Sequence, residues 1–200
     1  MLSGLLIALL AADPASPIPG TEGTPVRVER RLLIKQGHVF ATGGLGYLSR
    51  GDYYNNPGLF LSGSWYPMEM GGPELKLALF LSSLGAAGTE VFERTGLVPD
   101  AHRPVALLAA GWRQTLGYGK VLVGAGALVH FDVQAAAHMG FTFTDRGVSP
   151  SPMLGPGLLV RLSPRVHAQL DVPLVVTFEK RSRGLVSLGV LPTLTFGVVL

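Results

Sequence analysis

The chain of 200 residues contains no cysteine and few charged side chains. The absence of cysteine excludes a disulfide framework and thiol chemistry. Charged residues make up only 14% of the chain, against roughly 25% in soluble domains, whereas hydrophobic residues make up 48%. A chain with so few charged residues has too few polar side chains to cover the surface of a soluble domain of this size. The composition therefore indicates a protein that has lipid as part of its solvent.

Long apolar runs are also missing. A helix that crosses a membrane needs about 20 consecutive apolar residues, and here charged residues or Gly and Pro interrupt every such run. The uncharged tail from Gly184 to Leu200 contains Pro192 and several glycines. With 27 glycines and 15 prolines, the chain disfavours long helices in general. We therefore do not expect a helical membrane protein.

Three regions follow from the composition along the chain. Residues 1–12 (MLSGLLIALLAA) have the short apolar core and the small-residue end of a signal peptide, although no basic residue precedes the core. A buried N-terminal helix is the alternative. Residues 13–30 begin with a stretch rich in Pro, Gly, Ser and Thr, for which we expect a flexible periplasmic lead-in. Residues 31–200 are expected to form one domain, a β-barrel.

The strongest pattern in residues 31–200 is an alternation with a period of two, which is typical of β-strands. Between Leu128 and Thr144, one face is wholly apolar and the other is polar or small. The apolar face consists of Val129, Phe131, Val133, Ala135, Ala137, Met139, Phe141 and Phe143. Residues 165–179 and 73–81 repeat this alternation. Strands of this length exceed the usual 5–6 residues of soluble sheets and suit a membrane barrel.

The alternation predicts an all-β fold, an eight-stranded antiparallel up-and-down transmembrane β-barrel. The predicted strands cover residues 36–48, 57–67, 73–83, 105–123, 128–144, 154–162, 165–178 and 185–199. The connections between them alternate between short and mostly longer, as expected of periplasmic turns and outer loops. A helical turn is expected at residues 89–94, within the loop 83–104, and Gly96 would end it.

A soluble barrel of lipocalin type is the main structural alternative. Such a barrel is apolar inside and charged outside, whereas here the uniformly apolar face excludes charge and the mixed face carries it. A sheet with that apolar face in water would aggregate, but lipid requires it. The pattern therefore favours the membrane barrel and places the protein in the outer membrane of a Gram-negative cell.

A short motif supports the same fold. Tyr118-Gly-Lys120 precedes His130-Phe-Asp132, which opens a long strand, and this arrangement resembles an outer-membrane β-barrel domain family abundant in myxobacteria. The resemblance covers roughly residues 31–200. It implies an outer-membrane barrel and brings no catalytic residues.

The charged residues of the mixed face predict a network inside the barrel. Arg113, Arg161 and Lys76 share this face with Glu74, Asp132 and Asp171. Because an eight-stranded barrel has room for little more than side chains, we expect the charges to pair structurally. Strand adjacency suggests a ladder of four charges inside the lumen, in the order Arg113, Asp132, Arg161 and Asp171.

Catalytic, cofactor and metal sites are not predicted. His38, His130, His138 and His167 are expected on the inner face, but no two have the spacing of metal ligands. Asp132 and His130 resemble parts of a hydrolase, but no nucleophile elbow is present. Trp65, Trp112, Tyr47, Tyr66 and Tyr118 suit the aromatic girdles of a membrane barrel or ordinary packing.

These observations predict a non-enzymatic outer-membrane barrel with a structural or interaction role in the cell envelope and a lumen filled by side chains. Its expected partners are the lipid bilayer, the outer-membrane assembly machinery and other envelope proteins. A narrow solute channel and a subunit of a motility or secretion complex remain alternatives. The net charge of +3 comes from scattered residues without a basic stripe, so nucleic acid is not expected.

Overall fold

The computed structural model describes residues 34–51, 53–97, 100–123, 127–181 and 184–200. The expected signal peptide at residues 1–12 and the lead-in at 13–30 lie outside the described residues. The described residues form thirteen strands and one helix. Nearly all of the strands belong to a single antiparallel sheet.

The barrel has eight strand positions, which we call walls. Five walls are single strands, and three consist of two consecutive strands separated by a short break. The walls are β1 (Val39–Tyr47), β3 (Pro57–Trp65), β4 (Gly71–Phe80), β6 (Pro104–Val123), β7 (Ala127–Thr144), β8 (Gly147–Pro150) with β9 (Met153–Arg161), β10 (Val166–Asp171) with β11 (Leu174–Arg181), and β12 (Gly184–Val190) with β13 (Thr193–Val199).

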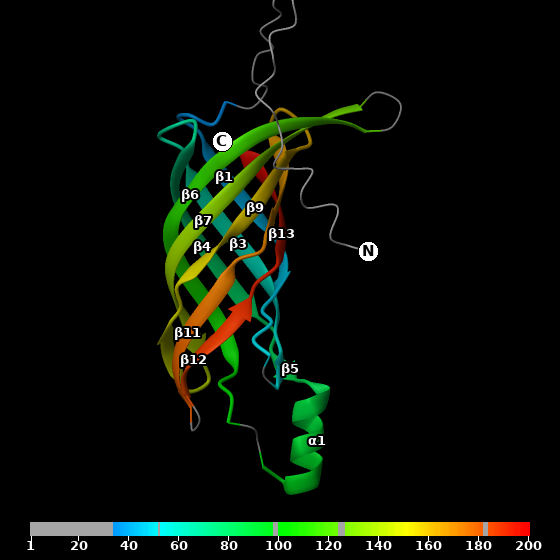
Figure 1. Cartoon of the computed structure of the whole chain (residues 1–200), viewed down its shortest axis with the longest axis vertical. Coiled ribbons are helices and arrows are strands. Elements are labelled where there is room, and N and C mark those ends of the chain that lie inside the picture. The colour runs from blue at the N-terminus through cyan, green and yellow to red at the C-terminus, as the bar shows by residue number, and fades with distance from the viewer. Residues whose placement is uncertain (1–33, 52, 98–99, 124–126, 182–183) are drawn as a thin grey trace, which may run out of the picture. The chain divides into compact units, whose positions relative to one another are not determined.

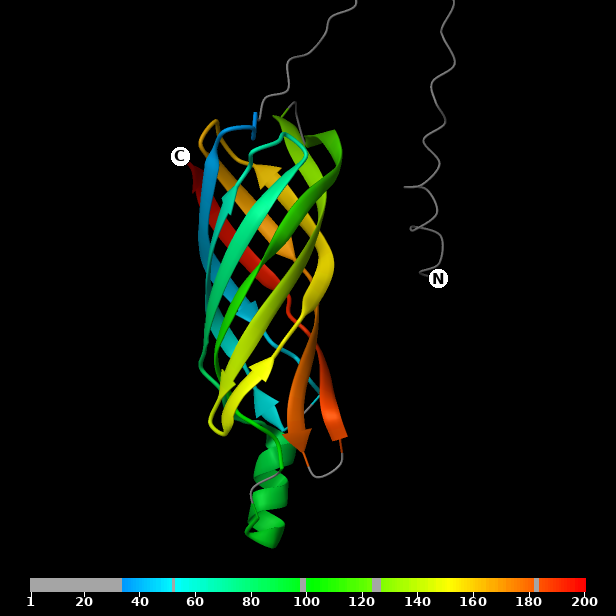
Figure 2. The same ribbon diagram turned by 90° about the vertical axis from the view of Figure 1, so that its left-hand side faces the viewer.

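The sheet closes on itself because the last strand pairs with the first. Phe40 of β1 lies opposite Val199 of β13, and the ladder continues to Gly46 opposite Thr193. All other neighbouring walls are consecutive along the chain and antiparallel. The predicted closed eight-stranded antiparallel barrel is therefore confirmed (Figures 1 and 2).

Prolines explain why three walls are split. Pro152, Pro173 and Pro192 lie at the breaks between β8 and β9, between β10 and β11, and between β12 and β13. A proline has no N–H to donate to the ladder, so regular pairing stops there. The carbonyls at these breaks still accept hydrogen bonds, as from the Tyr47 N–H to Pro192 (3.0 Å). The regular ladder is therefore interrupted at each proline, but the wall stays hydrogen-bonded to its neighbours.

The connections at one end differ from the prediction. The expected outer loop at residues 145–153 is wrong, because β8 occupies Gly147–Pro150 and continues the wall almost to the hairpin turn. The expected loop after Glu179 is likewise shorter, because β11 runs to Arg181 and β12 begins at Gly184. Strand pairing therefore extends further toward this end of the barrel than the alternation of side chains predicted. At residues 145–153, Pro150 and Pro152 interrupt the alternation.

The longest connection carries the helix. The two short strands β2 (Tyr54–Asn55) and β5 (Ser83–Leu84) pair with each other, and α1 (Ala86–Thr95) follows directly. Gly96 ends the helix in the left-handed conformation (φ 68°) and donates its N–H to the Phe92 carbonyl at 2.8 Å. This confirms the expected helical turn. None of the described helical residues forms a helix long and apolar enough to cross a membrane. We call this end, distal from Leu200, the loop end (Figure 1).

The outer face of the barrel is apolar. Five leucines form a continuous row of directly paired residues on neighbouring walls, and each is 44–65% exposed. The row consists of Leu170, Leu194, Leu45, Leu59 and Leu79. In the described residues of β1, β3, β4, β10 and β13, every Asp, Glu, Lys and Arg points into the lumen. The two faces therefore divide as the alternation predicted.

Candidate functional site

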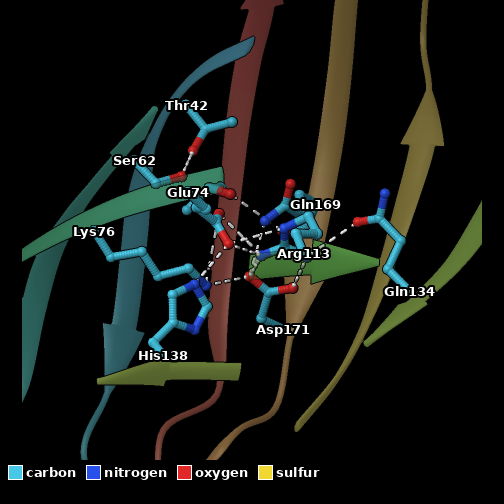
Figure 3. Close-up of polar contacts among 10 residues, drawn as sticks. Thr42, Ser62, Glu74, Lys76, Arg113, Gln134, His138, Gln169 and Asp171 are labelled. Atoms are coloured by element: carbon cyan, nitrogen blue, oxygen red, sulfur yellow. Dashed lines mark hydrogen bonds and ion pairs between the residues drawn. The ribbon is translucent and has the colours of Figure 1, made fainter. Parts of the chain in front are cut away.

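The lumen holds the polar side chains that could carry a function, and Arg113 lies at its centre. Arg113 extends from β6 and is fully buried. Its guanidinium donates two hydrogen bonds to Glu74 (3.0 and 3.0 Å), two to Asp171 (2.9 and 2.8 Å) and one to Gln134 Oε1 (3.0 Å). The planar guanidinium suits such paired contacts with carboxylates. One cation therefore joins β4, β7 and β10 across the barrel (Figure 3).

Further side chains complete the coordination of the two carboxylates. Lys76 Nζ donates to Asp171 at 2.8 Å and lies 3.9 Å from Glu74. Gln169 Nε2 also donates to Asp171 at 2.8 Å, and His138 Nε2 lies 2.9 Å from Glu74 Oε2. We call Glu74, Lys76, Arg113, Gln134, His138, Gln169 and Asp171 the central network (Figure 3).

A glycine makes room for the central network. Gly157 of β9 lies directly opposite Asp171 in the ladder. A methyl group at Gly157 would overlap Oδ1 of Asp171 and lie 2.9 Å from Nη1 of Arg113. The contact between Arg113 and Asp171 therefore depends on the missing side chain at this position.

A second group of polar residues fills the lumen nearer to Leu200. Lys35 precedes β1, is only 2% exposed, and forms an ion pair with Asp132. Its Nζ also donates to Thr115 Oγ1 at 2.7 Å and lies 5.5 Å from the centre of the Tyr66 ring. The backbone N–H of Lys35 donates to Glu69 at 2.9 Å. We call Lys35, Tyr66, Thr115 and Asp132 the terminal cluster.

On the other side of the central network lies an apolar layer, beside the buried hydroxyl groups of Thr142, Ser151 and Thr177. Nine buried hydrophobic residues from the barrel walls and a loop pack together there. They are Leu48, Phe60, Ala78, Phe80, Leu107, Ala109, Met153, Val175 and Leu191. The rings of Phe60 and Phe80 meet edge to face, with centroids 5.9 Å apart. A cavity of about 20 Å³ lies between this apolar layer and Asp171, which is room for roughly one water molecule.

Charged residues appear again beyond the apolar layer, at the loop end. Arg50 and Glu179 are 7% and 2% exposed, and Arg50 Nη1 lies 3.3 Å from Glu179 Oε1. Arg50 also donates to the carbonyl of His102, whose Nδ1 lies 3.5 Å from Glu179 Oε2. This cluster ties the connection between β1 and β2 and the connection after α1 to β11.

The structure brings together two of the four residues of the predicted ladder. Arg113 contacts Asp171 directly, whereas Asp132 lies in the terminal cluster with Lys35 as its ion-pair partner. Arg161 lies near the end of β9, and its Nε donates to the Ser163 carbonyl at 3.0 Å. The order expected from strand adjacency is therefore replaced by two separate groups.

The register of the strands accounts for this difference. Arg113 lies opposite Ala136 on β7, four residues along the strand from Asp132. At about 3.3 Å per residue, that offset is roughly 13 Å and exceeds the reach of an ion pair. Asp171 lies opposite Gly157, and Arg161 is four residues further along β9. Strand order gives the neighbours in a barrel, but register decides which side chains lie at the same height.

Sequence reasoning placed Glu74 and Lys76 on the inner face but missed Lys35, Arg50 and Glu179 as members of buried ion pairs. Lys35 and Arg50 lie outside the strands, where alternation gives no orientation. For Tyr66 the sequence left an aromatic girdle and ordinary packing open; the residue is 1% exposed and faces the lumen, which is the packing alternative. Trp65 and Trp112 are 52% and 40% exposed on the outer face.

The histidines do not assemble a catalytic or metal site. His138 and His167 are buried in the lumen, whereas His38 is exposed and His130 stacks on Tyr118 with ring centroids 6.0 Å apart. Among the described residues, no three His, Asp or Glu side chains are grouped so that they could hold a metal ion. His130 and Asp132, which resemble parts of a hydrolase in the sequence, lie two rungs apart on the β6–β7 ladder. His130 contacts Tyr118, and Asp132 pairs with Lys35.

No family model matches the chain, and no curated protein matches it. The resemblance drawn from Tyr118–Lys120 and His130–Asp132 therefore stays a prediction. The fold is similar to that of Ail, the attachment invasion locus protein of Yersinia pestis, at 12% identity and a TM-score of 0.42, over 82% of this chain and 99% of that chain. It is also similar to Neisserial surface protein A, at 10% identity and a TM-score of 0.40, over 82% and 95% of the two chains.

Proposed function

We propose that the protein is an integral outer-membrane β-barrel with no catalytic role, whose lumen is closed by its own side chains. Its exposed loops and periplasmic end would contact other components of the cell envelope. One observation carries the proposal: the outer face of the barrel is largely apolar, and the charged residues of the central network are paired inside.

The outer face supports a lipid environment. A closed barrel satisfies its backbone N–H and C=O groups within the sheet, which a membrane requires. The paired row of leucines from Leu170 to Leu79 would be an aggregation hazard in water but suits hydrocarbon. Exposed Trp65, at the end of β3, and exposed Trp112, opposite Pro73 near the start of β4, fit the membrane interface.

The lumen supports a structural role over a channel. Lys35, Lys76 and Arg113 supply three positive charges, and Glu74, Asp132 and Asp171 supply three negative charges. Each of these side chains is largely buried and lies within an ion pair. The terminal cluster, central network and apolar layer follow one another along the lumen, so three successive layers of side chains stand in the path of a solute.

The topology also gives an orientation. In outer-membrane barrels both termini and the short turns face the periplasm, and longer loops face outward. Here the described chain ends and the turn between β3 and β4 lie at one end, whereas α1 and the longest connection lie at the other. We therefore place α1 outside the cell, with insertion by the outer-membrane assembly machinery after export. The signal peptide at residues 1–12 is part of this proposal.

Fractionation of cell envelopes and gel electrophoresis test the location and the barrel together. The protein should be recovered with the outer membrane, and its gel mobility should change between unheated and boiled samples, because a closed barrel resists detergent until heated. Recovery in the soluble fraction, or an identical mobility in both samples, would contradict the proposal.

A further inference from the structure

A two-stranded ribbon extends past the barrel at the end where the chain terminates. The ladder between β6 and β4 ends at Gln114, and the ladder between β7 and β9 ends at Phe131. Beyond these points β6 and β7 continue to pair only with each other among the described residues, as far as Val123 opposite Ala127. This hairpin projects sideways from the end of the barrel (Figure 1).

The ribbon is apolar on both of its faces toward the tip. Leu122 lies opposite Leu128, and the next rung pairs Val121 with Val129. Successive rungs point to opposite faces, so neither face of this section is polar. Leu122, Val121 and Leu128 are 65%, 47% and 45% exposed. An isolated two-stranded ribbon is only marginally stable in water, and an apolar one is prone to aggregate.

The base of the ribbon has a different character. The rung after Val121 pairs Lys120 with His130, and the Tyr118 ring stacks on the His130 ring. Lys120 is the only charged residue among the described ribbon residues 116–123 and 127–131. Tyrosine and lysine beside an apolar segment are typical of residues at the boundary between phosphate headgroups and hydrocarbon.

The distances along the ribbon agree with such a boundary. Lys120 and Leu122 are two residues apart, which corresponds to about 7 Å along a strand. Interfacial segments bury their apolar side chains roughly 5–10 Å below the headgroups. A ribbon that tilts into the leaflet therefore brings Leu122 and Leu128 among the acyl chains when Lys120 lies at the phosphates.

We propose that the outer ends of the described β6 and β7 strands enter the periplasmic phospholipid leaflet, with Leu122 and Leu128 in hydrocarbon and Lys120 at the anionic phosphates. The ribbon is an additional membrane contact outside the barrel wall. A partner strand paired to the free edge is the competing occupant, but it would leave two apolar faces in water. The inference rests on the proposed insertion of the barrel in a membrane.

Spin labels on single cysteines test the inference, and the chain offers a clean background because it contains no cysteine. Leu122→Cys reports on the ribbon, Val133→Cys on the barrel wall, and Phe92→Cys on α1, each at an exposed position. The full-length variants are reconstituted in vesicles of phosphatidylethanolamine and phosphatidylglycerol. The relaxation of each label by oxygen, which partitions into lipid, is compared with relaxation by a water-soluble nickel chelate.

We expect the ratio of oxygen to nickel relaxation at positions 122 and 133 to exceed that at position 92 several-fold. A lipid signal at 133 with a water signal at 122 would overturn the ribbon insertion and leave the proposed barrel intact. A water signal at 133 would overturn both. Weak relaxation by either reagent at 122 would show that protein covers the tip, which would overturn the inference in favour of a partner strand.

Discussion

Replacing Arg113 with methionine should destabilise the barrel strongly. Methionine approximates the volume of the arginine stem but makes none of its five hydrogen bonds to Glu74, Asp171 and Gln134. Two buried carboxylates would then share the single lysine Lys76. Loss of one partner from a buried ion pair costs about 3–5 kcal/mol, because the remaining charge is uncompensated.

The loss can be measured as a shift in the urea midpoint of the detergent-solubilised barrel. With a slope of about 2 kcal/mol per molar urea, a loss of about 3–5 kcal/mol lowers the midpoint by roughly 1.5–2.5 M. The double variant Arg113→Met, Glu74→Gln provides the matched control, because it leaves Asp171 paired with Lys76 and no carboxylate of the central network in excess.

The double variant should be more stable than Arg113→Met alone, although it changes one more side chain of the wild-type lumen. This order follows from uncompensated charge as the main cost. A loss below about 1 kcal/mol for Arg113→Met, a magnitude typical of an ordinary substitution, would refute the reasoning. So would a double variant that is less stable than the single one.

Three further substitutions probe other parts of the barrel, each through the same urea midpoint. Gly157→Ala should cost about 1–3 kcal/mol by overpacking Asp171, and a neutral effect would show that the lumen has spare room. Leu170→Arg should cost about 2–4 kcal/mol in vesicles, whereas Leu97→Arg beyond α1 should stay within about 0.5 kcal/mol; equal effects would argue against a lipid-facing wall. Asp132→Ala should cost about 3–5 kcal/mol because Lys35 loses its buried partner, and Lys35→Met in the same chain should recover part of that loss.

The alternation of side chains was sufficient to predict the barrel and the direction of most side chains. It predicted that Val133 and Leu170 face outward and that Gln134, Glu74 and Lys76 face inward, and the structure agrees. The reason is physical: a strand between lipid and a packed lumen permits only one polarity on each face.

Pairing within the lumen could not be predicted in the same way. The partner of Asp132 is set by the register of β6 against β7 and by the entry of Lys35 from outside the strands. Arg113 spans the lumen to reach Asp171, so the partner is not on an adjacent wall. One sequence contains no signal for either register or cross-lumen contact.

The alternation of side chains also failed to predict the strand β8 at the loop end. Pro150 and Pro152 interrupt the alternation between β8 and β9, and the prediction therefore assigned this stretch to a loop. In the structure, the Ser151 N–H donates to the Gly140 carbonyl at 2.7 Å, which keeps the wall joined across the break. A proline marks a missing donor in a ladder and need not mark the end of a wall.

Conductance across a planar lipid bilayer tests the central claim, a membrane barrel closed by its own side chains, most directly. The full-length protein is first shown by heat-modifiable migration to be folded in the sample that is added to the bilayer. We predict that the inserted protein produces no stable conductance steps, because the central network and the terminal cluster block the lumen. Regular single-channel steps from the folded wild-type protein would contradict the account.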